Sequence, residues 1–535
     1  MQFYNLLGMT YSISKWDGLA KLSQLKISEN VSNMPTLFPV VDPKQQKFDI
    51  KKLKTEFKFN QVITSSYLMS KRIGHTKWDD YPKVSDYINF DGNIMMDSGA
   101  YQVMLYGDIE LGVKDTLSLQ INVDTDIGVI MDHPIGYDIN YHEAKKRVDQ
   151  TLENIEESIP YLDQNIIWTL PIQGGKYPSL MEYYLDEIYK RDYLDYFGMF
   201  ALGSVVPVMI NQDYKTLVDM ISIARKYLPE DKPLHLFGAG HPSIFSLVTF
   251  LGCDSYDSAA YTLMAKDQRY MTTSGTYQLI DLIELPCSCK ICSNHNVEDL
   301  KKLPKYELEK KISMHNLYVS KAEINNIKQH INDGNLWDLI MKRSSSVPNL
   351  NLATDAAIEK VTNGNLYKKY FSGLHLIKNE MLRIKELKDL KKPILKNISL
   401  GFISSLKNDA NKKWLIIAVS NYSSIYGKIP EQQITKYNNE NYKIMLLIPA
   451  IGIIPYGISD AYPVGQMITE ILIQDLPIDQ IVSQIKLLNE RGVDNIILYK
   501  EDDFDLFFEK LRNYVEVLKT IKVKSLITGL NEELR

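Results

Sequence analysis

The sequence predicts a closed (β/α)8 barrel that carries a metal-binding subdomain and is followed by a smaller α/β domain. Three observations support this prediction: short apolar runs alternate with helical patterns, polar residues end several of the runs, and three cysteines cluster after the last one. Such alternation is typical of βαβ units and a parallel sheet. The chain has 535 residues, which is too long for one ordinary domain.

Eight apolar runs are candidate barrel strands. They lie at 36–41, 61–68, 93–97, 126–132, 165–173, 197–203, 233–238 and 253–257. Between the later runs, apolar residues recur at helical spacing over 141–158, 179–191, 213–227 and 242–250. Eight strands make a closed barrel the economical interpretation, and an open doubly wound sheet is the alternative.

Polar residues and glycines end six of these runs. They are Asp97, Asp132, Gln173, Gly203, Gly238 and Asp257. Because side chains at the C-terminal ends of barrel strands converge on one mouth, where barrel enzymes do their chemistry, we expect a site there. Any single aspartate could instead cap the helix that follows it, but three in equivalent positions favour a site.

Charge and hydropathy exclude several classes of protein. The chain is 45% hydrophobic and 24% charged, which is typical of a soluble globular protein and excludes a disordered chain, a collagen and a coiled-coil rod. Its net charge of −5 gives no overall basic field, so a nucleic-acid partner would need local basic patches. Prolines interrupt the most apolar stretch, 444–458, and the N-terminus lacks the features of a signal peptide. We expect a cytoplasmic protein without a membrane span.

Three of the four cysteines, Cys287, Cys289 and Cys292, lie within six residues. In a large cytosolic protein such a cluster favours a metal over disulfides. His295 and His315 compete as the fourth ligand, and spacing alone slightly favours the nearer His295. Three thiolates and one imidazole would close a tetrahedral Zn²⁺ site, which is structural because no position remains for water. The alternative is a cysteine cluster that binds no metal.

The remaining sequence is predicted to be mainly helical up to about residue 397, with helical patterns at 297–312 and 320–332. The polar, proline-containing stretch 343–355 is a plausible domain boundary. A smaller α/β unit begins near residue 412, with strands at 414–420, 443–450 and 495–500 and helices at 463–474, 477–491 and 503–521. The predicted domains are 1–345, with a zinc subdomain at about 280–345, then a basic helical linker at 346–411 and an accessory domain at 412–535.

Several motifs occur together in one order along the first 345 residues. They include MDSGAYQVMLYGDIEL (96–111), PIQGGKYP (171–178), LHLFGAGHP (234–242), GCDSYDSAAYTLMAKDQRYM (252–271), LPCSCKICSNH (285–295) and MHNLYVSKAEI (314–324). In these motifs the sequence resembles the tRNA-guanine transglycosylases of the archaeal, tRNA-guanine(15) type. The segment 453–466 resembles part of their accessory region, whereas no segment resembles the RNA-binding PUA domain that usually closes such enzymes.

The resemblance implies a pentosyltransferase that replaces a guanine in the D-arm of tRNA with 7-cyano-7-deazaguanine (preQ0), the first step towards archaeosine. It makes Asp257 the nucleophile, Asp97 the group that transfers protons, and His315 rather than His295 the fourth ligand of one structural zinc. Asp132 would read the donor edge of the base. The other residues that would hold the base or shape its pocket are Gln173, Gly174, Gly203, Ser98 and Tyr101.

The resemblance also implies a homodimer formed through the zinc-bearing region, and it makes a separate RNA-binding chain of the PUA type a candidate partner. Two related functions are alternatives: insertion of a deazaguanine into DNA, and tRNA binding by a non-catalytic paralogue of the archaeosine pathway. The presence of Asp97 and Asp257 in their motifs disfavours the paralogue. An unrelated zinc hydrolase is excluded because a metal held by four protein ligands has no site for water.

Overall fold

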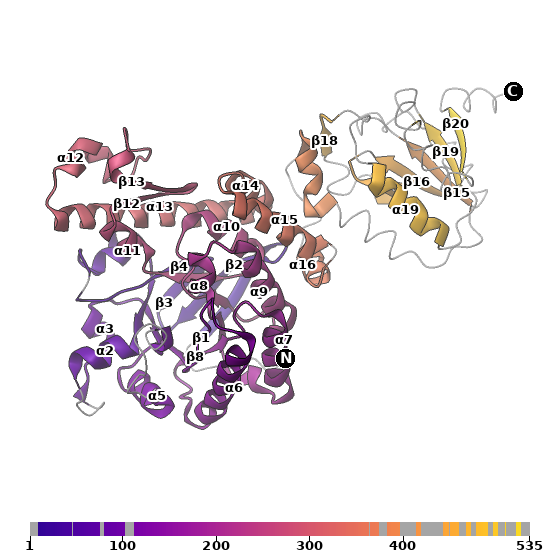
Figure 1. Cartoon of the computed structure of the whole chain (residues 1–535). Helices are drawn as coiled ribbons and strands as arrows, with labels where there is room; N and C mark the ends of the chain where they lie inside the picture. Colours follow the sequence, from indigo (N-terminus) through magenta and orange to yellow (C-terminus); the bar gives the residue numbers. More distant parts are fainter. Residues whose placement is uncertain are drawn as a thin grey trace. The chain divides into compact units, whose positions relative to one another are not determined.

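The chain forms two compact units, Met1–Lys360 and Val361–Arg535, in a computed structural model (Figure 1). The structure describes residues 9–44, 46–74, 80–101, 112–362, 364–373, 382–395, 413–418, 442–448, 450–458, 467–471, 478–490, 496–500, 509 and 521–525. Within these ranges, no helix is both long enough and apolar enough to span a bilayer.

Eight parallel strands form the core of the first unit. They are β4 (Thr36–Pro39), β5 (Gln61–Ser65), β6 (Asn93–Asp97), β7 (Ile127–Val129), β8 (Ile167–Ile172), β9 (Met199–Leu202), β10 (Leu234–Leu236) and β11 (Ser255–Ser258), in the order β4-β11-β10-β9-β8-β7-β6-β5. A parallel bridge between Val40 and Ile63 joins the two ends of this order, and the Val41 N–H donates to the Ile63 carbonyl at 2.8 Å. The predicted barrel is therefore confirmed, and the open-sheet alternative is wrong.

Helices follow the strands and lie outside them, as α6, α7 and α9 do in Figure 1. The helices of this layer are α1 (Lys51–Thr55), α2 (Ser66–Ile73), α3 (Val84–Ile88), α5 (Val113–Asn122), α6 (Tyr141–Ser158), α7 (Pro178–Lys190), α8 (Val205–Ile210), α9 (Tyr214–Tyr227), α10 (Pro242–Phe250) and α11 (Ala260–Lys266). The Asn140 side chain caps α6 by accepting from the Glu143 N–H, and Val148, Leu152 and Ile155 bury its apolar stripe. The four predicted helices agree with α6, α7, α9 and α10 to within one residue.

An antiparallel sheet of β1 (Met9–Asp17), β2 (Ala20–Ile27) and β3 (Asn30–Met34) covers one end of the barrel. Its buried Leu25, Ile27 and Met34 share one core cluster with barrel residues that include Ile127, Ile167 and Met199. These three barrel residues are the first residues of their strands. The sheet therefore closes the N-terminal end of the barrel and leaves the C-terminal mouth for chemistry. The sequence patterns did not predict it.

The subdomain after the barrel contains a hairpin and a long helix. Its elements are β12 (Arg269–Thr272), β13 (Gly275–Gln278), η4 (Leu279–Asp281), η5 (Cys292–Asn294), α12 (Val297–Lys301), α13 (Lys305–Asp333), α14 (Leu336–Ser344) and α15 (Pro348–Thr362). The two helical patterns predicted here become α12 and a single 29-residue helix, α13, which begins after Pro304. The stretch 343–355 holds the end of α14 and the first half of α15, and the domain boundary near residue 345 stays a prediction.

The second unit contains a five-stranded sheet of order β17-β16-β15-β19-β20, in which only β17 is antiparallel to its neighbour. Its elements are α16 (Tyr367–Ser372), β14 (Leu382–Ile384), η6 (Leu387–Lys391), β15 (Lys413–Ala418), β16 (Tyr442–Ile448), β17 (Gly452–Pro455), η8 (Tyr456–Ile458), β18 (Met467–Thr469), α19 (Ile478–Glu490), β19 (Ile496–Lys500) and β20 (Ile521–Ser525). The three predicted strands and the helix at 477–491 are confirmed.

Two helical predictions in this unit are wrong over part of their length. Met467–Thr469, inside the predicted helix 463–474, is strand β18, which pairs with β14. Leu382–Ile384, inside the predicted helical linker 346–411, is strand β14 itself. The two strands lie far apart in the chain, so no local hydrophobic periodicity could predict their pairing. Most of the predicted helix 503–521, and residues 459–466 of the accessory motif, lie outside the described residues.

Candidate active site and metal site

Three predicted carboxylates meet at the C-terminal mouth of the barrel. Asp97 ends β6, Asp132 follows β7, and Asp257 lies in β11. Asp132 and Asp257 are only 7% and 8% exposed. Burial raises the pKa of Asp97 to about 7, and repulsion by the charges of Asp132 and Asp257 adds to this rise. A cluster of buried like charges at a barrel mouth is characteristic of a catalytic site rather than of helix capping.

Asp97 is held at the start of a tightly bonded loop. The Ser66 hydroxyl donates to the backbone carbonyls of Asp97 at 2.8 Å and of Ser98 at 2.9 Å. Hydrogen bonds from the backbone of Ser98 and Gly99 to the Asp97 carboxylate oppose the rise of its pKa. Ser98 is fully buried, and Tyr101, in the helical residues that follow, is half-buried. A carboxyl group with a pKa near 7 can both give and take a proton at neutral pH.

Asp132 belongs to a buried chain of hydrogen bonds. The Gln173 side-chain amide donates to Asp132 Oδ2, the Ser204 hydroxyl donates to Gln173 Oε1 at 2.5 Å, and the Ile135 N–H donates to Ser204 Oγ at 2.7 Å. Burial raises the pKa of Asp132 to about 6, although the Gln173 bond opposes the rise. The orientation of Gln173 is thereby fixed, with its nitrogen towards Asp132. Sequence reasoning did not identify Ser204.

The glycines at these strand ends allow side chains to approach closely. A Cβ at Gly203 would lie 2.2 Å from Gln173 Nε2 and 3.4 Å from Asp132 Oδ2. Gly174 has φ of +154°, and a Cβ there would lie 2.3 Å from Met181 Cγ. Any larger residue at position 203 would displace Gln173, and any larger residue at position 174 would displace helix α7.

Asp257 accepts two hydrogen bonds at the same oxygen. The Gly238 N–H donates to Oδ1 at 2.8 Å, and His235 Nε2 lies 3.2 Å from the same atom. His235 is fully buried and was not identified from the sequence. The signal that could have found it is a histidine in the middle of an apolar strand run that ends at the mouth.

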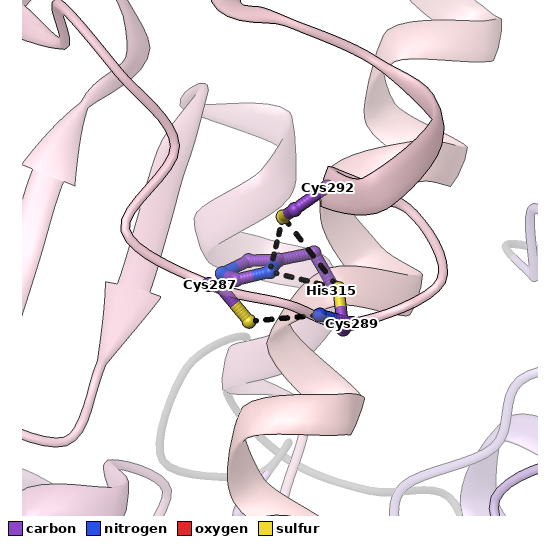
Figure 2. A group of neighbouring side chains, drawn as sticks. All are labelled: Cys287, Cys289, Cys292 and His315. Atoms are coloured by element: carbon purple, nitrogen blue, oxygen red, sulfur yellow. Dashed lines mark hydrogen bonds between the residues drawn. The ribbon is translucent and has the colours of Figure 1, made fainter.

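Cys287, Cys289, Cys292 and His315 come together beside the β12–β13 hairpin (Figure 2). Their potential ligand atoms all lie within 4.8 Å of one another, with His315 Nδ1 at 3.5 Å from the Cys289 sulfur and 3.4 Å from the Cys292 sulfur. His315 is buried on α13. This geometry can hold a metal ion, and three thiolates with one imidazole suit tetrahedral coordination.

The second nitrogen of His315 is also engaged. Nε2 lies 2.9 Å from the Met271 carbonyl, so it carries the proton and leaves Nδ1 as the ligand atom. The Tyr270 ring stacks on the imidazole at 3.6 Å between centroids. His295 instead directs Nδ1 to the Ile291 carbonyl at 2.9 Å, and the cluster within the described ranges does not include it. The slight preference of spacing for His295 is therefore wrong, and His315 completes the cluster.

A family model described as Queuine tRNA-ribosyltransferase matches residues 17–349. The chain belongs to this family. All the candidate site residues of this ribosyltransferase-family chain lie inside the matched segment, and they occupy the barrel mouth and the cysteine cluster described above.

Individual family members are similar over most of the chain. A tRNA-guanine(15) transglycosylase of Methanococcus aeolicus is 32% identical over 472 residues, which cover 85% of this chain and 68% of the relative. One of Sulfolobus acidocaldarius is 32% identical over 467 residues, covering 85% and 88%. One of Methanosarcina mazei is 36% identical over 340 residues, covering 64% and 68%. The first two similarities extend well beyond the barrel.

Proposed function

We propose that this chain is a tRNA-guanine(15) transglycosylase that exchanges guanine 15 in the D-arm of tRNA for 7-cyano-7-deazaguanine, the first step of archaeosine formation. The observation that carries the proposal is the cluster of three carboxylates, two of them buried and the third, Asp97, partly buried, at the barrel mouth of a ribosyltransferase-family chain. Relatives that bear this name match 85% of the chain. The enzyme would act in the cytoplasm as a homodimer, with a separate PUA-type chain as a candidate helper in RNA binding.

The proposed exchange proceeds through a covalent ribosyl intermediate. The Asp257 carboxylate attacks the ribose C1′ as the C1′–N9 bond to guanine breaks, and protonated Asp97 gives its proton to the departing base. The incoming base then loses a proton to Asp97 and attacks C1′, which releases Asp257. Two inversions at one carbon retain its configuration, and each proton that is given is returned. The target nucleotide must leave its stack, which costs a few kcal/mol that binding in the pocket must offset.

Asp132 is proposed to read the incoming base. An ionised carboxylate accepts from the N1–H and the exocyclic amine of a guanine-like ring, a donor pair that adenine lacks. Gln173, together with the backbone at Gly174 and Gly203, would hold the carbonyl edge, and Ser98 and Tyr101 would shape the pocket. The hydrogen-bond chain through Ser204 supports this assignment because it fixes the Gln173 amide before the base arrives.

Asp132→Asn should weaken selection of the base more than it weakens binding of tRNA. Loss of hydrogen bonds to a charged acceptor predicts a KM for free guanine about 10- to 100-fold higher. Steady-state kinetics with guanine and adenine as incoming bases, at saturating tRNA, measure this. Asp138→Asn is the matched control, since Asp138 is exposed in the same loop and should have no effect. Unchanged selectivity in Asp132→Asn would remove its reading role.

The cysteine cluster is proposed to bind one structural Zn²⁺. With four protein ligands the ion would hold the loop at 285–292 against α13 and would take no part in the exchange. Purified protein should contain about one equivalent of zinc per chain, and Cys292→Ser should lose it and unfold at a lower temperature. Cys253→Ala, which changes a buried cysteine outside the cluster, should keep the metal. Elemental analysis that finds less than about half an equivalent in the unaltered protein would contradict the proposal.

One experiment tests the proposed function as a whole. The protein is incubated with tritiated guanine and unmodified tRNA and, separately, with a G-rich DNA duplex. Label in the tRNA alone is the expected result. Label in the DNA would favour the DNA-modifying alternative, and label in neither, with tRNA still bound, would favour the non-catalytic paralogue.

A further inference from the structure

Two neighbouring strands place three polar side chains in the barrel interior. β10 and β11 run parallel, and His235 is the register partner of Ser255. Successive residues of a strand face opposite sides, so Ser255 and Asp257 share the inner face while Tyr256 points outward. The Tyr256 ring stacks on Phe245 of the covering helix α10 at 4.3 Å between centroids, which agrees with this assignment.

These inward side chains form a continuous hydrogen-bonded row. Ser255 Oγ lies 2.9 Å from His235 Nδ1, and His235 Nε2 lies 3.2 Å from Asp257 Oδ1. An ionised carboxylate can only accept, so Nε2 carries the imidazole proton and Nδ1 accepts from the Ser255 hydroxyl. The carboxylate therefore selects the tautomer that donates to it, and the Ser255 hydroxyl satisfies the other ring nitrogen.

The imidazole has little freedom to turn away from Asp257. It is fully buried, and it packs edge-to-face against Phe38 at 5.4 Å and Phe237 at 5.1 Å between ring centroids. The second donor to Oδ1, the Gly238 N–H, belongs to the backbone and is fixed as well. Among the described residues, both hydrogen bonds found to this carboxylate end on Oδ1.

We propose that His235 is a positioning residue that, with the Gly238 N–H, anchors Oδ1 of Asp257 and so presents Oδ2 to the ribose C1′. This inference rests on the proposed function, in which Asp257 is the nucleophile. Anchoring one oxygen fixes the rotamer of the carboxylate before the substrate binds, and the attacking atom then loses little freedom in the transition state. Ser255 acts one step further away, through the imidazole.

Replacement of His235 by phenylalanine tests the proposal, because it keeps an aromatic ring and removes the donor. We expect kcat to fall about 10- to 100-fold with KM for tRNA nearly unchanged. Formation of the covalent adduct in a single turnover should slow by a similar factor, because the lost donor orients the attacking carboxylate.

Two further variants separate positioning from packing. His235→Gln keeps a side-chain donor and should recover part of kcat, and Ser255→Ala should give a smaller loss than His235→Phe. If His235→Phe folds and keeps the kcat of the unaltered enzyme, the proposal is overturned. If it does not fold, Ser255→Ala decides, and an unchanged kcat in that variant overturns the proposal.

Asp257→Asn in the same assay distinguishes this inference from the proposed function. Turnover retained in Asp257→Asn would remove the nucleophile itself. An inactive Asp257→Asn beside a fully active His235→Phe would leave the proposed function standing and remove only the positioning role.

Discussion

Asp257→Ala is expected to abolish guanine exchange and the covalent RNA adduct together. We expect kcat to fall by at least about 10⁴-fold, the scale seen when a covalent nucleophile is removed. The reason is that, in the part of the chain that the structure describes, no other carboxylate accepts from both His235 and the Gly238 N–H, where the proposed nucleophile lies. Incorporation of labelled guanine into tRNA measures the exchange, and a denaturing gel of the trapped protein–tRNA complex measures the adduct.

The control for Asp257→Ala is Asp267→Ala, which removes an exposed carboxylate at the end of α11. It should leave both assays unchanged. Binding of tRNA should survive in Asp257→Ala, because the phosphate contacts that dominate RNA affinity lie outside the pocket. Labelled guanine that still enters tRNA with Asp257→Ala would show that the nucleophile is another group.

The barrel could be predicted from the sequence because each strand lies in a short apolar run, and six of the eight runs end in a polar residue or glycine. The sheet β1–β3 was not predicted because its inward positions are not uniformly apolar. On β2 the buried side of the strand carries Lys21 and Ser23 beside Leu25 and Ile27. Lys21 is buried because it pairs with Asp254 at 3.1 Å, a partner more than two hundred residues away. A pattern of alternating hydropathy cannot reveal a strand whose buried charge is matched by so distant a residue.

The residues of the candidate site also fall into two groups, those that the sequence pattern predicts and those that it does not. Asp97, Asp132, Gln173 and Asp257 could be predicted because they end the apolar runs that contain the strands, and the C-terminal ends of strands meet at one mouth in any parallel barrel. His235 and Ser204 were not predicted, because their contacts depend on the register of neighbouring strands and on loop geometry, although a histidine inside an apolar strand run is a signal for His235. His315 shows the limit of spacing along the chain. Its helix returns to the cysteine loop, whereas the nearer His295 bonds to its own loop backbone.

Asp97→Asn should keep tRNA binding and lose turnover, with kcat lower by about 10²- to 10⁴-fold, the usual contribution of a positioned proton donor and acceptor. The pKa of Asp97 near 7 makes the loss dependent on pH. In the proposed exchange the departing guanine takes its proton from protonated Asp97, so adduct formation by the unaltered enzyme should decline as pH rises through about 7. That alkaline limb should be missing in Asp97→Asn. An equal loss of binding and turnover would count against proton transfer.

The repulsion that raises the pKa of Asp97 supplies a second test of its role. Asp132→Asn removes one of the two repelling charges, so the alkaline limb should move to lower pH in that variant. Stability should respond as well. When folding raises the pKa of a carboxyl group, the folded protein loses stability as pH rises from the ordinary pKa of that group, about 4, towards its pKa in the folded state, about 7. Asp97→Asn cannot ionise, so its melting temperature should exceed that of the unaltered enzyme above pH 7 while its activity is lower, a combination that simple damage to the fold would not produce.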